Sequence, residues 1–345
     1  MPNPLNPAAE TIELIGENAS LKRTISRLNK GEHELVGPGD DAAVISAPNG
    51  SFVVTTDTLV QDHDFKLEWS TGYDLGWKAV ASNIADVAAM GAQPTVLVVA
   101  MVVPKNTLVS WLESFADGLR DACQTLAPGS AVVGGDLASG SQIVISVTAH
   151  GDLQGRQPVL RSGAQPGDVL AVAGTLGRAA CGLDLLLSSN SDLVSAWDDW
   201  VNVQRRPQPP IAAGIAAGEV GATAMLDISD GLAKDASRIA AASGVHLVIE
   251  PMQLQGFEAI LEGASQALAT SPQGKMSAAE YEHKWVIGGG EDHSLLATFA
   301  AGTTLPRGFK RIGQVVALAG GQQPTVYLSD KPIDTNMGWD SVTGS

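Results

Sequence analysis

The sequence predicts a layered α/β protein built from two domains. Its 345 residues exceed the usual size of a single domain. Hydrophobic residues make up 44% of the chain and glycines number 38, whereas aromatic residues make up only 5%, which favours a core of small aliphatic side chains and a turn-rich fold. Segments with the periodicity of strands alternate with segments that have the periodicity of helices. These observations exclude a collagen-like chain, a coiled coil and a disordered chain.

The first domain is expected to span residues 1–150, because strand and helix patterns alternate regularly up to that point. Its helices are expected over residues 11–28, 73–90 and 112–126. Its strands are expected over residues 42–45, 52–57, 95–103, 131–133 and 143–149.

The second domain is expected to span residues 151–345. It begins with a segment rich in Gly, Pro, Gln and Arg, residues 151–167, that is typical of a linker. Its strands are expected over residues 168–173, 223–228, 245–249, 293–299, 309–316 and 325–328. Its helices are expected over residues 178–187 and 231–242, and residues 253–284 have helical character.

The charge balance excludes two classes of partner. The chain has 37 acidic and 21 basic side chains, a formal net charge of −16 and a pI near 4.6, so a nucleic-acid phosphate backbone is not an expected partner. The longest apolar run, residues 96–103, is far shorter than the ~20 residues that span a bilayer, so no membrane association is expected. The N-terminus lacks the pattern of a secretion signal, and we expect a cytoplasmic location.

The two cysteines, Cys123 and Cys181, lie in apolar helical patterns. They form no CxxC motif and have no histidine nearby in the sequence, which favours buried reduced thiols over a zinc site or a disulfide. We assign them no chemical role.

The chemical signal is a series of acidic residues beside glycines or hydroxyl groups, each expected at the end of a strand or the start of a helix. Each one alone can be explained as a turn or N-cap residue. Their recurrence in one chain is harder to explain in that way. The series consists of Asp40, Asp41, Asp57, Asp136, Asp227, Asp230, Glu291 and Asp292.

Clustered carboxylates cannot all remain ionised in a dry site unless cations share it. Oxygen ligands favour hard metals, and magnesium characteristically binds carboxylates together with phosphate oxygens. The neighbouring glycines let a backbone approach phosphate closely, and Ser229 to Gly231 stand where a helix N-terminus would add its preference for anions. Motifs of P-loop proteins, dinucleotide-binding folds and protein kinases are absent from the sequence. The residues therefore predict a magnesium-dependent site for a nucleotide or polyphosphate.

These motifs and their order resemble those of thiamine-monophosphate kinases over roughly residues 35–340. The resemblance implies a two-domain fold similar to that of aminoimidazole ribonucleotide synthetase, a homodimer in which the N-terminal domains pair, and transfer of the ATP γ-phosphoryl group to thiamine monophosphate. The motifs are Gly37-Pro38-Gly39-Asp40-Asp41, Thr55-Thr56-Asp57-Thr58, Asn83-Ile84-Ala85-Asp86, Gly134-Gly135-Asp136, Arg161-Ser162-Gly163, Asp227-Ile228-Ser229-Asp230-Gly231 and Gly288-Gly289-Gly290-Glu291-Asp292.

The resemblance also implies roles for single residues. Several magnesium ions would be held, directly or through water, by Asp41, Thr55, Thr56, Asp57, Asp86, Asp136, Asp227 and Asp230. ATP would be contacted by Gly135, Asp136, Arg161 and Ser229. The thiamine portion would be contacted by Glu291 and Trp339, and an aromatic face suits a cationic thiazolium.

Three of these residues have ordinary alternative explanations. Asp86 lies with Lys78 and Ser82 in a stripe at helical spacing that is typical of a solvated helix face. Arg161 could be a linker charge, although a guanidinium suits phosphate. Trp339 could be a C-terminal packing anchor.

The chain departs from the family pattern at one position. Family members commonly have a histidine seven residues after the Thr-Thr-Asp-Thr aspartate, where this chain has Asp64 with His63 beside it. Either His63 reaches the same place, or the contact with substrate differs here. Both residues are kept as candidate substrate contacts.

No general base is expected, because the attacking group would be a phosphate oxygen that is already largely ionised at neutral pH. We expect direct in-line transfer, assisted by positioning and by neutralisation of charge. Two alternatives remain: another ATP-dependent synthetase of the same superfamily, and a non-catalytic nucleotide-binding protein.

Overall fold

A computed structural model describes residues 10–15, 17–36 and 44–339. The chain divides into two compact units. Unit 1 takes its described residues from 1–87 and 94–152, and unit 2 takes them from 88–93 and from 153 onward. The predicted mixed α/β fold in two parts is therefore confirmed. Residues 88–93 also belong to the second unit, which the periodicity of the sequence did not predict.

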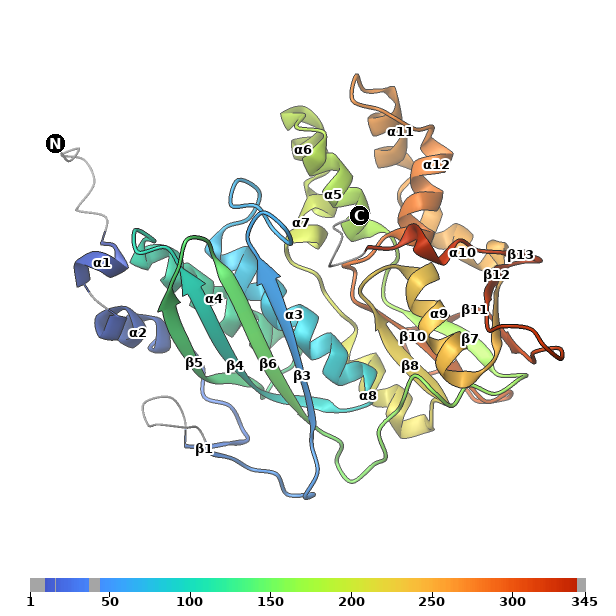
Figure 1. Cartoon of the computed structure of the whole chain (residues 1–345), viewed down its shortest axis with the longest axis horizontal. Coiled ribbons are helices and arrows are strands. Elements are labelled where there is room, and N and C mark those ends of the chain that lie inside the picture. Colours follow the sequence, from blue (N-terminus) through green and yellow to red (C-terminus); the bar gives the residue numbers. More distant parts are fainter. Residues whose placement is uncertain (1–9, 16, 37–43, 340–345) are drawn as a thin grey trace. The chain divides into compact units, whose positions relative to one another are not determined.

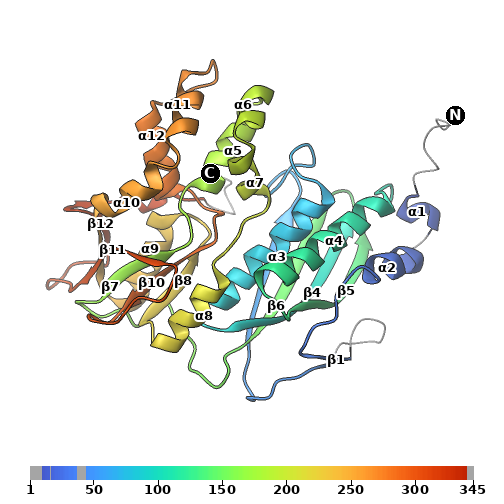
Figure 2. The ribbon, with the colours of Figure 1, turned by 180° about the vertical axis from the view of Figure 1, so that it is seen from behind.

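Unit 1 is built on a four-stranded sheet in the order β3-β6-β4-β5. β3 and β6 are antiparallel, whereas β4 and β5 are parallel. Helices α3 and α4 cover one face of this sheet, and no helix of the described part of unit 1 covers the other (Figures 1 and 2). The elements are β3 (Val53–Val60), α3 (Gly72–Ala89), β4 (Gln93–Val103), α4 (Val109–Leu126), β5 (Ala131–Ser139) and β6 (Val144–Asp152).

Side chains alternate across this sheet with the two-residue period of a strand. On β6, Ile145, Val147 and Ala149 are buried, whereas the residues between them are half-buried. The buried residues face α3 and α4 and form the core of the unit, and the opposite face bears mostly hydroxyl groups and small side chains.

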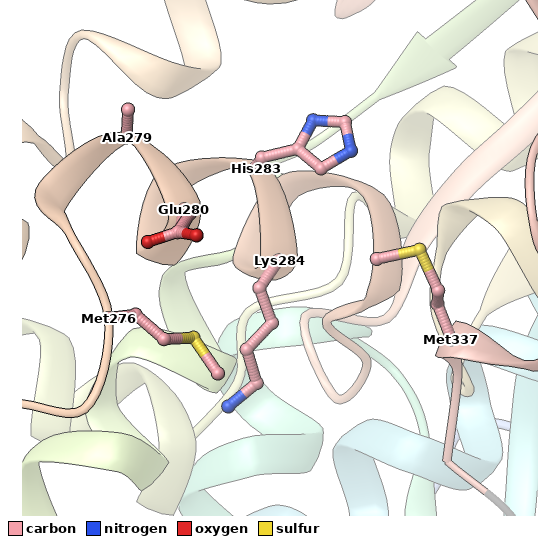
Figure 3. Close-up of a pocket in the computed structure, with 6 residues that line it drawn as sticks. All are labelled: Met276, Ala279, Glu280, His283, Lys284 and Met337. Atoms are coloured by element: carbon pink, nitrogen blue, oxygen red, sulfur yellow. The ribbon is translucent and has the colours of Figure 1, made fainter.

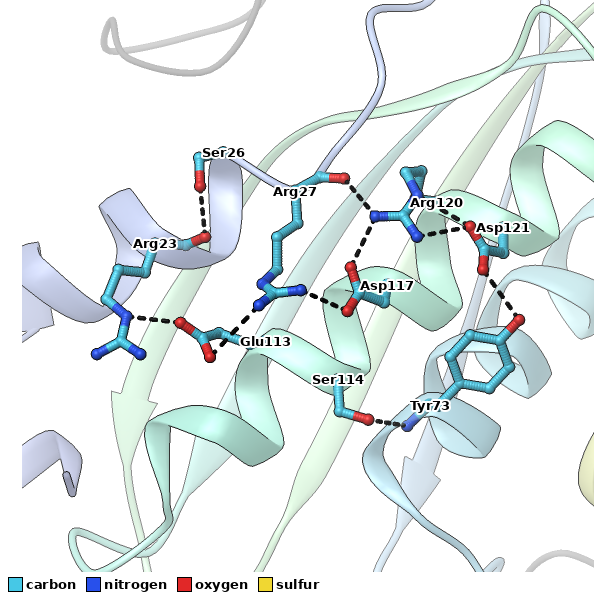
Figure 4. Close-up of polar contacts among 9 residues, drawn as sticks. All are labelled: Arg23, Ser26, Arg27, Tyr73, Glu113, Ser114, Asp117, Arg120 and Asp121. Carbon is cyan, nitrogen blue, oxygen red and sulfur yellow. Dashed lines mark hydrogen bonds and ion pairs between the residues drawn. The ribbon is translucent and has the colours of Figure 1, made fainter. Parts of the chain in front are cut away.

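The N-terminal part of unit 1 is attached to α4 by ion pairs. α1 (Ile12–Ile15) and α2 (Glu17–Ile25) precede a two-stranded ladder of β1 (Glu34–Val36) and β2 (Val44–Ile45). Arg23 Nε lies 2.6 Å from Glu113 Oε1, and Arg27 Nη1 lies 2.5 Å from Asp117 Oδ2 (Figure 4). Arg120 adds a bond of 2.7 Å to Asp117, so this carboxylate joins α4 to the segment that follows α2.

Unit 2 is built on a seven-stranded sheet in the order β13-β12-β9-β11-β7-β10-β8. Every pair is antiparallel except β12 with β9, which is parallel. The strands are β7 (Val169–Ala173), β8 (Ala224–Ile228), β9 (His246–Ile249), β10 (Ser294–Phe299), β11 (Phe309–Val316), β12 (Val326–Leu328) and β13 (Lys331–Pro332).

The helices of unit 2 pack around this sheet, and a buried cluster of small and aromatic side chains supports α8. Phe299 and Phe309 meet edge to face there, with ring centroids 5.1 Å apart. The helices are α5 (Arg178–Leu187), α6 (Ser191–Ala196), α7 (Asp198–Arg205), α8 (Ile211–Val220), α9 (Leu232–Ser243), α10 (Pro251–Glu258), α11 (Glu262–Thr270), α12 (Ala278–His283), the π-helix η1 (Lys284–Gly288) and the 3₁₀-helix η2 (Thr335–Met337).

Two strands run differently from the sequence-based expectation, and both carry a candidate aspartate. β5 continues through two glycines to Ser139, so Asp136 lies inside the strand and pairs with Ala100. Asp57 likewise lies within β3 and pairs with Val147. The prediction that these two aspartates stand at strand ends is wrong, because ladder pairing with the neighbouring strands extends past the turn-forming residues.

In the described part of the chain, we find no helix with both the length and the apolar character that crossing a bilayer would require.

Candidate active site

The first group of candidate residues lies between β3 and α3 in unit 1. Thr55 Oγ1 donates a hydrogen bond of 2.8 Å to Asp86 Oδ2. Asp57 lies two residues along β3 and therefore on the same face as Thr55. A hydroxyl and two carboxylates are thus presented from two regular elements.

The same alternation separates Thr56 from this group. Thr56 is exposed on the other face of the sheet, where its Oγ1 donates to the Val147 carbonyl at 2.8 Å. The structure therefore does not bring the Thr56 side chain together with Thr55, Asp57 and Asp86.

The helix stripe that carries Asp86 is not a solvated face. Lys78 is 3% exposed and Ser82 is 7% exposed, although the spacing alone is typical of a surface stripe. The stripe faces β3, since Asp86 bonds to Thr55. The solvated-face explanation of Asp86 is therefore wrong: the polar stripe belongs to the interior of the fold.

Gly135 and Asp136 lie on β5, next to a β-bulge in its pairing with β4 between Leu97 and Val98. A Cβ on Gly135 would lie 2.2 Å from the Val99 carbonyl oxygen, so the close approach of the two backbones requires glycine. Asp136 and its partner Ala100 are both exposed, whereas Val99 is buried. Asp136 is thus on the open face of the sheet.

The turn after β3 contains both candidates for the position that departs from the family pattern. Asp64 Oδ2 accepts the Val60 N–H at 2.7 Å, and its Oδ1 lies 3.0 Å from His63 Nδ1. Asp64 is therefore engaged in its own turn. The His63 side chain is 36% exposed, compared with 21% for that of Asp64.

The second group of candidate residues lies in unit 2, where β8 leads through a short loop into α9. Asp227 is buried near the end of β8, and its Oδ2 lies 3.2 Å from His293 Nδ1. The carboxylate of Asp230 pairs with Arg238 and has Lys234 Nζ at 3.5 Å. This aspartate is therefore met by two cationic side chains from the first two turns of α9.

A buried carboxylate that the sequence analysis did not single out holds this loop in place. Asp235 is fully buried, and its Oδ2 accepts the N–H groups of Asp230 at 2.9 Å and Gly231 at 3.1 Å. Burial raises the pKa of Asp235 to about 7, and the nearby Arg238 opposes that rise. The sequence does carry a signal for this role of Asp235, an acidic residue in the first helical turn after Ser-Asp-Gly. Such residues bind the N–H groups at the start of a helix.

Gly288 and Gly290 of the Gly288-Gly289-Gly290 segment pack directly against the β8–α9 loop, whereas Gly289 packs against Trp285 and Ala180. A Cβ on Gly290 would lie 2.1 Å from the Ser229 carbonyl oxygen, and one on Gly231, which has a φ of 123°, would lie 2.5 Å from the Gly288 carbonyl oxygen. Glu291, with a φ of 69°, donates its N–H to the same Ser229 oxygen at 3.0 Å. Two segments that are about sixty residues apart therefore form one backbone unit.

Asp292, next to Glu291, has a structural task. It is buried and accepts hydrogen bonds from Thr175 Oγ1 at 2.5 Å and from the Ala179 N–H at 3.1 Å at the start of α5. Burial raises the pKa of Asp292, while the bonds from Thr175 and Ala179 oppose the rise. The carboxylate thus caps α5 and fixes the glycine loop beside it.

The C-terminal segment joins the same group. The Trp339 N–H donates to the Asp230 carbonyl at 2.9 Å, and Lys234 Nζ donates to the Trp339 carbonyl. The structure therefore brings together four candidates from three separate parts of the sequence: Ser229, Asp230, Glu291 and Trp339.

Arg161 lies elsewhere in unit 2. Ser243, the last residue of α9, accepts from the Gly163 N–H at 3.1 Å and donates to the Arg161 carbonyl at 3.1 Å. Asp230 stands before the first turn of the same helix. Arg161 and the Ser229–Asp230 loop are thus at opposite ends of α9, and the structure does not bring them together.

A cavity of about 470 Å³ opens beside η1 and the C-terminal segment. Met276 and Met337 stand at opposite sides of it with Lys284 between them (Figure 3). Its charged groups already have structural partners: Glu280 caps α12 through Ser277, and Lys284 Nζ lies 2.9 Å from Asp184 Oδ2. The cavity is therefore a mainly apolar recess next to the segment that carries Trp339.

The predicted magnesium ligands are divided between the two units, and Asp41 lies outside the described residues. Within residues 10–15, 17–36 and 44–339, no three histidine, cysteine or acidic side chains form a ready cluster for a metal ion. The donors that are present, carboxylates and hydroxyls, are those that suit magnesium. The shared metal site stays a prediction.

Comparisons with known proteins agree with this fold and these motifs. Residues 39–153 match the family described as AIR synthase related protein, N-terminal domain, and residues 165–304 match its C-terminal domain. The thiamine-monophosphate kinase of Mycobacterium tuberculosis (strain CDC 1551 / Oshkosh) is 42% identical over 92% of this chain and 91% of its own length.

Solved structures give the same result. A crystal structure of thiamine-monophosphate kinase from Stenotrophomonas maltophilia K279a superposes with a TM-score of 0.72 and 30% identity, covering 92% of this chain and 96% of that one. A structure titled AaThiL complexed with AMPPCP and TMP superposes with a TM-score of 0.69 and 29% identity, covering 85% of this chain and 90% of that one.

Proposed function

This chain belongs to the thiamine-monophosphate kinase family, and we propose that it transfers the γ-phosphoryl group of ATP to thiamine monophosphate, giving thiamine diphosphate and ADP. One observation of the structure carries the proposal furthest. Backbone bonds in unit 2 join Ser229, Asp230, Glu291 and Trp339, the residues for which the family resemblance implies contacts with nucleotide, metal and thiamine.

The chemistry needs no general base. The attacking group is a phosphate monoester whose second pKa is about 6, so it is mostly ionised at neutral pH. The difficulty is the repulsion between this dianion and the triphosphate, on a chain that already carries a net charge of −16. Magnesium, bound by the carboxylates, would supply the neutralising positive charge.

Each candidate residue has a task in this proposal. Thr55 orients the carboxylate of Asp86, and Asp57 stands on the same face to share cations with it. The full proposed ligand set is Asp41, Thr55, Thr56, Asp57, Asp86, Asp136, Asp227 and Asp230, of which Thr56 and Asp136 would act on the other face of the unit 1 sheet from Thr55, Asp57 and Asp86. Gly135, Asp136 and Ser229 contact ATP in this proposal, and Arg161, at the opposite end of α9 from Ser229, would contact a different part of the nucleotide.

The acceptor side is assigned to Glu291 and Trp339, with His63 favoured over Asp64. A tryptophan face attracts a cationic thiazolium, and Glu291 is held in place by its N–H bond to Ser229. Asp64 already accepts the Val60 N–H, and its other oxygen lies 3.0 Å from His63 Nδ1, so in this proposal the carboxylate orients the more exposed imidazole. In-line attack then transfers the phosphoryl group directly, without a phosphorylated enzyme.

The open face of the unit 1 sheet supports a homodimer as part of the proposal. Phe52 is 55% exposed and Val54 is 56% exposed, and the adjacent Thr56 and Thr58 present hydroxyls on the same side. A β-sheet face with exposed apolar side chains is a suitable surface for a second copy of itself. We place this enzyme in the cytoplasm, where ATP is available and where the buried thiols of Cys123 and Cys181 would stay reduced.

The test of the proposed reaction combines the purified protein with magnesium, ATP and thiamine monophosphate and follows the nucleotides and thiamine phosphates by chromatography. Thiamine diphosphate and ADP should form in equal amounts, and EDTA or omission of thiamine monophosphate should stop both. ATP binding without any thiamine diphosphate would refute the kinase and favour an ATP-dependent synthetase of the same superfamily.

A further inference from the structure

Lys234 links two parts of unit 2 that the proposed function assigns to different tasks. It is the third residue of α9, and its side chain is 23% exposed. Its Nζ lies 3.5 Å from Asp230 Oδ2 and donates a hydrogen bond to the carbonyl of Trp339. One ammonium group therefore touches both the proposed metal-binding loop and the proposed acceptor-binding segment.

The aliphatic part of Lys234 also supports that segment. A Cβ on Gly338 would lie 2.9 Å from Lys234 Cβ and 3.0 Å from its Cδ, so the chain before Trp339 rests directly on the lysine stem. The Trp339 N–H donates to the Asp230 carbonyl. Both backbone groups of Trp339 are thus held from the start of α9, one by the Asp230 carbonyl and the other by the Lys234 ammonium.

Asp230 does not depend on Lys234 in the same way. Its carboxylate pairs with Arg238, which also pairs with the buried Asp235. The Asp235 carboxylate in turn accepts the Asp230 N–H. Removal of the Lys234 ammonium should therefore leave the Asp230 loop in place and release the Trp339 carbonyl.

We propose that Lys234 is a positioning residue that fixes Trp339 for the phosphate acceptor. This inference rests on the proposed function for its kinetic consequence, because Trp339 is there assigned to the thiamine portion. Lys234 acts through Trp339, and it stabilises the backbone conformation from which the indole projects.

The direct test measures hydrogen–deuterium exchange of the peptide that contains Trp339 in the full-length protein. In K234M the Trp339 amide should exchange about fivefold faster or more, because a charge-assisted hydrogen bond that holds the segment is lost. K234R should restore much of the protection, since a guanidinium can also donate to the carbonyl. K331M removes an exposed lysine of the same unit and should exchange as the unmodified chain does.

Unchanged exchange in K234M would overturn the proposal. K234Q serves the same purpose if methionine impairs folding, because it also removes the charge. Faster exchange throughout α9 and the glycine loop would equally overturn it, since that pattern means a general loss of structure.

Kinetics supply the functional half of the test. K234M should raise KM for thiamine monophosphate about fivefold to tenfold, with changes of less than about twofold in kcat and in KM for ATP. In a W339A background the same substitution should have no further effect on the acceptor KM. Equal increases in both KM values, or additive effects with W339A, would contradict the assignment to the acceptor side.

The two proposals fail in distinguishable ways. A chain that forms no thiamine diphosphate under any condition refutes the proposed function. The exchange comparison between K234M and K331M still decides whether Lys234 positions Trp339, because it needs no substrate.

Discussion

The two units hold their acidic groups by different means. In unit 1, Asp57 and Asp86 project from the interior of a strand and a helix, and the Thr55 hydroxyl orients Asp86 at 2.8 Å. In unit 2, Asp230 lies in a loop that is fixed by the buried Asp235 and by the glycines packed against it. A strand or a helix positions a side chain through its own regular backbone hydrogen bonds. A loop lacks these bonds and needs close contacts with neighbouring backbone instead.

Because of this difference, substitutions in the two units should affect different properties, catalysis in unit 1 and stability in unit 2. Loss of a carboxylate in unit 1 should remove a ligand and leave the hydrogen-bonded ladder intact. A small change of volume in the unit 2 loops should disturb the backbone itself.

Replacement of Asp57 by Asn should reduce turnover by about 100-fold or more, because a neutral amide is a poor magnesium ligand on a site that must neutralise phosphates. The thermal midpoint should change little, since Asp57 keeps its pairing with Val147. Steady-state formation of thiamine diphosphate and a melting curve check both expectations. Asp152→Asn, the same chemical change elsewhere in unit 1, is the control, and comparable losses in both variants would remove the case for a ligand.

Gly290→Ala should destabilise unit 2 by about 3 kcal/mol, because the new Cβ would lie 2.1 Å from the Ser229 carbonyl oxygen, which is backbone and cannot turn away. Urea unfolding measures the change. Gly256→Ala on α10 has no neighbour within 4 Å and should be neutral or stabilising by about 0.5–1 kcal/mol. A Gly290→Ala protein as stable as the control would show that the two loops are not tightly packed.

Val54→Asp should weaken the proposed dimer by about tenfold or more, because it places a charge on the open face of the unit 1 sheet. Sedimentation equilibrium at several protein concentrations measures the dissociation constant. Val220→Asp, which changes a residue that is 46% exposed on unit 2, should leave it unchanged. Equal dissociation constants for the two variants would refute this face as the dimer surface.

Asp117→Asn should have the smallest effect, a loss below about 1 kcal/mol, because Asp117 belongs to a partly exposed network. Burial raises the pKa of Asp117, but the hydrogen bonds from Arg27 and Arg120 hold it below its ordinary value of 3.8. A lowered folded-state pKa stabilises the protein above that ordinary value, and this contribution is lost as the pH falls through the folded-state pKa. Urea unfolding of both proteins should thus show a difference near pH 7 that shrinks below about pH 4, and a difference that is independent of pH would contradict the prediction.

Much of the fold could be predicted because its periodicities are local. The strand at 168–173 and the helix at 178–187 lie almost where apolar spacing places them, in β7 and α5. The helices α6 and α7 were not predicted, because with six and eight residues they are too short for a helical periodicity to stand out in the sequence. Asp136 was placed at a strand end because Gly-Gly-Asp is typical of a turn, whereas pairing with β4 continues the strand.

The residues of the candidate site could be predicted from the sequence. Their contacts with one another in space could not. Ser229, Asp230 and Gly231 form a local motif that by itself indicates a helix start with a preference for anions. The packing of Gly290 on Ser229 depends on contacts across about sixty residues, which no local pattern encodes. The burial of Lys78 was missed for the same reason, because helical spacing indicates which residues share a face and does not indicate what covers it.

The most direct test of the central claim follows the terminal phosphate itself. The protein is mixed with magnesium, ATP labelled in the γ-phosphate and thiamine monophosphate, and the reaction is stopped with denaturant after less than one turnover. Direct transfer predicts label in the terminal phosphate of thiamine diphosphate, with none on the denatured protein. Label in inorganic phosphate alone, or covalently on the protein, would contradict the account.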